Sequence, residues 1–123
     1  SRAEWMALHI FGVLFYDVSA MPFDSWTADR NAALQPGCHV GMYRGADAIH
    51  QLDLTDHLPE ISAPTLALFG SEDKMVPVKD GHLVSQCVPQ SQLILIEECG
   101  HFPMYEHPDA YLSTLNEFLQ GKG

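Results

Sequence analysis

Two residues capable of acid–base chemistry each follow a short apolar run. Asp73 comes shortly after the run at residues 65–69, and His101 comes shortly after the run at residues 93–96. Nearly continuous apolar runs of this length are typical of strands that are buried on both faces of a parallel sheet. In open parallel sheets, functional groups lie just past the carboxyl ends of the strands. The sequence therefore predicts that Asp73 and His101 are neighbours in space.

The residues around this pair form two motifs. Gly70-x-x-Asp73-x-x-x-Pro77 follows the first run, and Gly100-His101 follows the second. Together they resemble the acid turn and the histidine turn of the α/β-hydrolase family, and the resemblance extends over about residues 58–119. It implies a nucleophile–histidine–acid triad in which Asp73 is the acid and His101 is the base. Glu72 is the alternative acid.

The chemistry of such a triad explains why these residue types are needed. A hydroxyl nucleophile is weak at neutral pH, and a neutral imidazole activates it by taking its proton. The carboxylate holds the imidazole in one tautomer and stabilises the imidazolium that forms. Either Asp73 or His101 alone fits an ordinary turn or capping role. The two together, each after a strand and a glycine, favour catalysis.

The nucleophile is not evident in this chain. In this family it precedes the acid, on a G-x-S-x-G turn between a strand and a helix. None of the five serines before Asp73 has small residues at both required offsets; they are Ser1, Ser19, Ser25, Ser62 and Ser71. The segment at residues 37–41 has two glycines, but His39 holds the nucleophile position and no strand precedes it. No His-Gly-Gly turn for an oxyanion hole occurs either. We therefore expect the nucleophile to lie outside this chain.

The predicted fold class is α/β: the C-terminal part of an α/β-hydrolase fold, with two parallel strands, flanking helices and a helical cap segment. We expect residues 1–55 to be the cap or lid portion and residues 56–123 to be the part of the core that carries the acid and the histidine. A two-stranded sheet has two open edges and too little apolar surface to be stable alone. The predicted partner is the N-terminal hydrolase portion, or a second copy, which would complete the sheet.

Apolar periodicity and turn residues predict the helices. Helices are expected within residues 1–18 and over residues 28–34, 42–52, 78–88 and 108–119. In the helix within residues 1–18, the expected apolar face comprises Trp5, Leu8, Phe11 and Phe15. For the helix over residues 28–34, the expected N-cap is Ser25 or Thr27. In the last, the apolar stripe expected to dock on the sheet comprises Leu112, Leu115, Phe118 and Leu119. These helices must position the two strands and their turns.

Composition narrows the possible partners and location. The 16 acidic and 6 basic residues argue against nucleic acid and against an anionic membrane surface. No apolar run approaches the roughly 18 to 20 residues of a membrane span, and residues 1–4 do not open a signal peptide. The odd number of cysteines (Cys38, Cys87 and Cys99) suits a reducing compartment, so we expect a cytoplasmic protein. Cys99 is expected to be a buried packing residue.

Two other groups of polar residues contain residue types found in metal sites or acid–base sites. His101, Glu106 and His107 lie close in sequence, but Pro103 disfavours the regular helix on which histidine ligands are usually spaced, so no metal site is expected. No cofactor is expected. Glu97 and Glu98 are adjacent and are expected on opposite faces at the end of a strand, in solvent, where they cannot act as a carboxylate pair.

Two functions of different classes remain open. The first is hydrolysis of an ester, a lactone or a carbon–carbon bond in a small carbonyl substrate, with this chain supplying Asp73 and His101. The second is a non-catalytic relative, or a fragment with a role in binding or assembly. No glycine-rich phosphate loop opens a helix, so kinase and dinucleotide-dependent oxidoreductase functions have no support.

Overall fold

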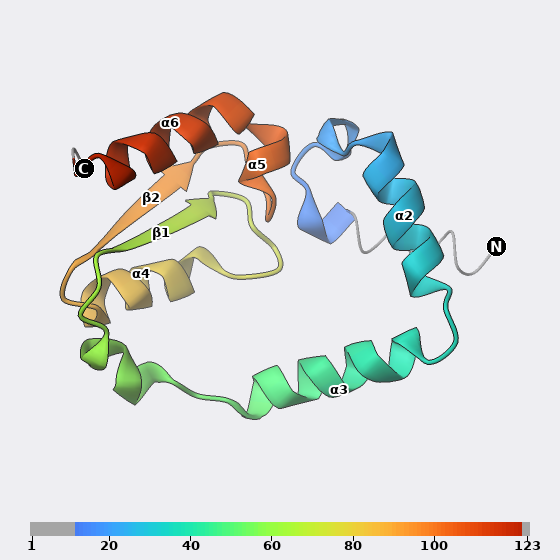
Figure 1. Cartoon of the computed structure of the whole chain (residues 1–123), viewed down its shortest axis with the longest axis horizontal. Helices are drawn as coiled ribbons and strands as arrows, with labels where there is room; N and C mark the ends of the chain where they lie inside the picture. Colours follow the sequence, from blue (N-terminus) through green and yellow to red (C-terminus); the bar gives the residue numbers. More distant parts are fainter. Residues whose placement is uncertain (1–11, 122–123) are drawn as a thin grey trace.

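The computed structural model describes residues 12–121, and its centre is a pair of parallel strands (Figure 1). Strand β1 (Thr65–Gly70) pairs with β2 (Ser91–Ile96) in parallel, and the register places Thr65 opposite Ser91 and Gly70 opposite Ile96. Both predicted strands are confirmed. Because the strands are parallel and in register, their carboxyl ends, and hence the turns after them, lie at the same edge of the sheet.

Helices flank this pair, and the strands run between α4 and α6 in Figure 1. Helix α4 (Val78–Cys87) connects the strands and packs against both. Gly81 makes this approach possible, because a Cβ there would lie 3.0 Å from side-chain atoms of Leu93 and Phe69. The short helix α5 (Pro103–Glu106) and helix α6 (Pro108–Leu119) follow β2. Both begin with proline, whose missing N–H costs nothing in a first turn.

The segment before β1 is helical. Residues 12–14 are in a helix, followed by η1 (Val18–Ala20), α2 (Phe23–Ala33), α3 (Cys38–Gln51) and η2 (Thr55–Glu60). In Figure 1, α3 runs apart from the strand pair. Tyr43 and Ile49, two large apolar residues of α3, are 74% and 75% exposed.

Several predicted helix boundaries were wrong. Helix α2 begins at Phe23 rather than at residue 28, so Ser25 and Thr27 lie inside the helix and the N-cap is Pro22. Proline's restricted φ favours the extended backbone that precedes a helix. Helix α3 begins at Cys38 rather than at residue 42, directly after Gly37 at φ 83°.

A helix was expected within residues 1–18, but the chain is no longer helical at residue 15. Trp5, Leu8 and Phe11, which belong to the expected apolar face, lie outside the described residues. Phe15 is 3% exposed but lies beyond the helical residues 12–14, so tertiary contacts rather than a helical face bury it.

The apolar stripe predicted for α6 was only partly correct. Leu115 and Phe118 are half-buried, but Leu112 and Leu119 are 53% and 70% exposed. A pair of strands offers little surface for a helix to cover. In the described part of the chain the buried apolar residues are few: Phe15, Ala67, Val88, Ile96 and Cys99. Most of this small core lies near the carboxyl ends of the strands. Within residues 12–121, no helix is both long and apolar enough to cross a membrane.

Candidate active site

The structure brings Asp73 and His101 together. Asp73 Oδ2 lies 2.8 Å from His101 Nδ1. The Asp73 side chain is 5% exposed, whereas that of His101 is 30% exposed. A buried carboxylate facing Nδ1 favours the tautomer with its proton on Nδ1, which leaves Nε2 free to accept a proton. Glu72, the alternative acid, is exposed, and its N–H donates to the Cys99 carbonyl oxygen at 2.9 Å.

The turn after β1 holds the Asp73 carboxylate in place. Its second oxygen, Oδ1, accepts hydrogen bonds from the N–H groups of Met75 and Val76 at 2.8 and 2.9 Å. The N–H of Asp73 donates to the Gly70 carbonyl oxygen at 3.3 Å. The Asp73 side chain is therefore fixed by its own turn, and one oxygen remains directed to the histidine.

Hydrogen bonds between the two turns join them into one unit. Ser71 N–H donates to the Ile96 carbonyl oxygen at 2.8 Å, which continues the parallel ladder beyond the strands. The Glu98 N–H donates to Ser71 Oγ at 3.1 Å. Together with the bond from Glu72 to Cys99, these contacts hold the backbone beneath Asp73 against the backbone beneath His101.

Two glycines allow this close approach. A Cβ at Gly70 would overlap the backbone carbonyl groups of Cys99 and Gly100. A Cβ at Gly100 would lie 2.6 Å from the Leu14 carbonyl oxygen and 2.7 Å from the Tyr16 nitrogen. The glycine of each motif is thus required by packing, not by a left-handed backbone, because neither has a positive φ.

The position of Glu97 and Glu98 differs from the prediction. Strand β2 ends at Ile96, so the two residues lie in the following turn and not on the strand, although both are exposed as expected. Glu98 has φ 52°, which puts it in the left-handed region. His107 Nε2 lies 3.1 Å from the Glu98 carbonyl oxygen. The left-handed backbone at Glu98 is incompatible with a strand, so β2 ends before it and the turn to His101 begins there.

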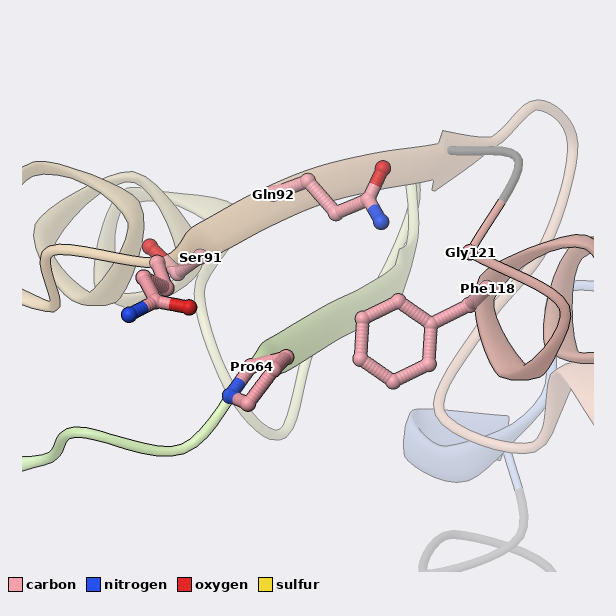
Figure 2. Close-up of a pocket in the computed structure, with 6 residues that line it drawn as sticks. Pro64, Ser91, Gln92, Phe118 and Gly121 are labelled. Carbon is pink, nitrogen blue, oxygen red and sulfur yellow. The ribbon is translucent and has the colours of Figure 1, made fainter.

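A small pocket lies at the pair. It has a volume of about 120 Å³, and its lining residues are Leu68, Phe69, Gly70, Asp73, Val76, His101 and Pro103. Its walls are mostly apolar, and the two titratable groups are Asp73 and His101. A wider and more open pocket of about 350 Å³ lies at the other end of the strands, where Pro64, Ser91, Gln92 and Phe118 surround it (Figure 2). It contains none of the candidate site residues.

Cys99 is buried beneath the site, as predicted, with 0% of its surface exposed. Burial raises the pKa of its thiol to about 11, and the nearby carboxylates of Glu106 and Asp73 act in the same direction. Since only the thiolate is an effective nucleophile, this cysteine is a packing residue and not a reactive one.

We expect Cys99 to resist alkylation. At pH 8, about three units below its pKa, only about one molecule in a thousand carries the thiolate, and the raised pKa means that reactivity increases only as the pH approaches 11. Treatment with iodoacetamide followed by peptide mass spectrometry should label the partly exposed Cys38 and Cys87 and leave Cys99 unmodified. All three should react after unfolding in urea. Rapid labelling of Cys99 in the folded chain would contradict this prediction.

In the sequence, Glu106 stands out only as a neighbour of His101 and His107, whereas the structure gives its carboxylate three hydrogen-bond donors. Its carboxylate accepts hydrogen bonds from three backbone N–H groups, those of Tyr16, Asp17 and Gly100, each at 2.8 Å. Two of these partners are 89 and 90 residues away in the sequence, and no local pattern signals such a contact. Among residues 12–121, no group of three or more histidine, cysteine or acidic side chains is arranged to hold a metal ion.

Comparison with curated proteins gives several relatives. The model of the alpha/beta hydrolase family matches residues 1–114. The chain is 29% identical over 113 residues to the 2-hydroxy-6-oxononadienedioate/2-hydroxy-6-oxononatrienedioate hydrolase of Cupriavidus pinatubonensis, which covers 89% of this chain and 39% of that protein. It is 31% identical over 75 residues to the pimeloyl-(acyl-carrier protein) methyl ester esterase of Aliivibrio fischeri. This match covers 61% of this chain and 29% of that protein. The chain thus spans well under half the length of both relatives.

Solved structures give a consistent result for the fold. An esterase from Exiguobacterium antarcticum superposes with a TM-score of 0.79 at 23% identity, over 98% of this chain and 43% of that one. A meta-cleavage product hydrolase from Pseudomonas fluorescens IP01 superposes with a TM-score of 0.77 at 22% identity, over 98% and 46%. The arrangement of helices and strands described above therefore recurs as one part of larger enzymes.

Proposed function

This chain belongs to the alpha/beta hydrolase family, and on that basis we propose that it supplies the acid and the base of a hydrolytic triad. Asp73 is the acid and His101 is the base. The observation that carries the proposal is the 2.8 Å contact between Asp73 Oδ2 and His101 Nδ1, made by turns at the carboxyl ends of neighbouring parallel strands. The nucleophile is assigned to a segment outside this chain, since no serine here lies on a strand-to-helix turn of the required kind.

In the proposed mechanism, His101 Nε2 takes the proton of the nucleophile's hydroxyl as its oxygen attacks the substrate carbonyl carbon. The imidazolium that forms is stabilised by the Asp73 carboxylate, whose other oxygen accepts hydrogen bonds from the N–H groups of Met75 and Val76. His101 then gives the proton to the leaving group. Water, activated by the same imidazole, attacks the acyl intermediate and releases the acid product.

The names of two relatives support a substrate class. One is named as a hydrolase of 2-hydroxy-6-oxo dienedioates and trienedioates, and another as a methyl ester esterase. Both names describe substrates with a ketone or ester carbonyl group, so we assign this chain to an enzyme that cleaves an ester or a carbon–carbon bond next to a carbonyl group. Residues 1–55 are assigned to the cap over the site and residues 56–123 to the core.

The open edge of β1 is the proposed site of assembly with the rest of the hydrolase. In the described residues the sheet contains β1 and β2 alone, and β1 pairs with β2 on one edge. A further parallel strand on the other edge of β1 would cover backbone groups that would otherwise form an exposed sheet edge. It would also bring a nucleophile-bearing segment to the carboxyl end of the sheet, where Asp73 and His101 lie.

A fluorophosphonate probe tests the proposal directly. Intact mass spectrometry of the native sample, before and after the probe, should reveal a hydrolase portion that carries a nucleophilic serine and gains the mass of the probe. A sample in which this chain assembles with such a portion but neither takes up the probe nor hydrolyses aryl esters would overturn the assignment. It would favour the alternative, a non-catalytic role in binding or assembly.

A further inference from the structure

The carboxylate of Glu106 joins the histidine turn to the segment that follows the N-terminal helical residues. Oε1 accepts the Gly100 N–H at 2.8 Å. Oε2 accepts the N–H groups of both Tyr16 and Asp17, also at 2.8 Å. Hydrogen bonds from neutral N–H groups to a carboxylate are stronger than bonds between neutral groups. One side chain at the end of α5 therefore holds two segments that are far apart in the sequence.

The same two segments make further contacts around this carboxylate. The His101 N–H donates to the Leu14 carbonyl oxygen at 2.6 Å. The ring of Phe15 packs against Phe102, with centroids 5.2 Å apart, and against Tyr105, with centroids 6.3 Å apart. Phe15 is 3% exposed. The bonds to Glu106 thus lie beside an aromatic cluster. The bond from Gly100 is partly buried, whereas those from Tyr16 and Asp17 are exposed.

These contacts fix the backbone that carries the base. The N–H groups of Gly100 and His101 are bound on either side, to Glu106 and to Leu14, while Asp73 holds the imidazole ring at Nδ1. Asp73 can restrain the ring only if the Cα of His101 is already in place. The hydrogen bond from the Gly100 N–H to the Glu106 carboxylate therefore restrains the backbone that carries His101, the partner of Asp73.

We propose that Glu106 is a positioning residue for His101. It sets the distance between the imidazole and the nucleophile by holding the Gly100 N–H, and it makes no contact with the reacting atoms. This inference rests on the proposed function of Asp73 and His101.

The test uses Glu106→Gln in the assembled hydrolase, with Glu97→Gln as the matched control. Glutamine has the same size, but it offers one acceptor oxygen and one NH₂ group. In either orientation of the glutamine amide, its NH₂ group faces a backbone N–H donor, that of Gly100 or those of residues 16–17, and two donors cannot form a hydrogen bond. The control removes one negative charge from the same region of the chain, at an exposed position in the turn after β2. Both variants change net charge equally.

We expect Glu106→Gln to lower kcat about 10- to 100-fold with KM nearly unchanged, because a misplacement of about 1 Å costs a catalytic group up to about 100-fold. The rate of fluorophosphonate labelling should fall in parallel, since it also depends on His101. Glu97→Gln should match the wild type in all three quantities. Wild-type values of kcat and labelling rate for Glu106→Gln would overturn the positioning role. Equal losses in both variants would assign the effect to charge and would also overturn it.

A second measurement covers the possibility that Glu106→Gln does not fold. Hydrogen exchange of the unsubstituted protein, followed by NMR, should show slow exchange of the amide hydrogens of Tyr16, Asp17 and Gly100. Fast exchange at these amides would overturn the proposal without any variant. An inactive wild-type assembly would instead refute the proposed function. If the same amides nevertheless exchanged slowly, Glu106 would have a structural role alone, and the positioning role would be overturned as well.

Discussion

Replacing His101 by alanine should lower kcat of the assembled hydrolase by about 10⁴-fold or more, with little change in KM. The variant removes the group proposed to take the proton from the nucleophile. Members of a triad act as a unit, so that losing one removes most of what the triad contributes. The His101 side chain is 30% exposed and the protein should still fold. Steady-state hydrolysis of an aryl ester measures the effect.

His82→Ala is the matched control for this variant. His82 is exposed on α4, within the same part of the core, and lies between the two motif turns in the sequence. Its kcat should stay within about twofold of the wild type. Retained turnover in His101→Ala, at a level near that of His82→Ala, would refute His101 as the base.

The companion change Asp73→Asn should cost about 10³- to 10⁴-fold in kcat. Asparagine can keep the acceptor that Met75 and Val76 need, but its NH₂ group then faces His101 Nδ1. Two donors face each other, so the imidazole turns to the tautomer with its proton on Nε2, which cannot accept a proton from the nucleophile. A full loss in His101→Ala without any loss in Asp73→Asn would leave the acid unassigned.

The largest expected effect on stability is that of Gly70→Ala. A Cβ at this position would overlap the backbone carbonyl groups of Cys99 and Gly100, and backbone atoms cannot rotate away as a flexible side chain can. Overpacking of this kind costs about 3 kcal/mol or more in the free energy of unfolding. Because Gly70 pairs with Ile96 at the end of the sheet, the strain would fall on the contacts that bring the two turns together. Urea unfolding followed by circular dichroism measures it.

Gly45→Ala is the control with the opposite expected sign. Gly45 lies within α3, and a Cβ there meets no atom within 4 Å. Replacing a helical glycine by alanine in open space stabilises the helix by about 0.5 to 1 kcal/mol. A Gly70→Ala variant as stable as the wild type would show that the two turns can separate without cost, which would contradict this prediction.

The sequence alone predicted the central elements of this chain. The two apolar runs became β1 and β2, and the pattern of residues 78–88 and 108–119 became α4 and α6 with nearly the expected bounds. The resemblance to the C-terminal part of an α/β hydrolase, and the α/β class with two parallel strands, are confirmed by the family match and the superposed structures. These features depend on short-range patterns of apolar and turn residues, which a sequence displays directly.

Tertiary structure decided what depends on distant contacts. Leu112 and Leu119 have the spacing of a buried stripe, yet they are exposed because the two strands leave α6 little surface to cover. Two of the three N–H groups that Glu106 binds lie about 90 residues away in the sequence. Gly70 and Gly100 are needed because other backbone segments touch them. The sequence by itself determined that Asp73 and His101 follow parallel strands. Only the folded chain decided how closely the two residues approach and which carboxylate holds the backbone beneath the histidine. Both features depend on packing between segments that no local sequence pattern relates.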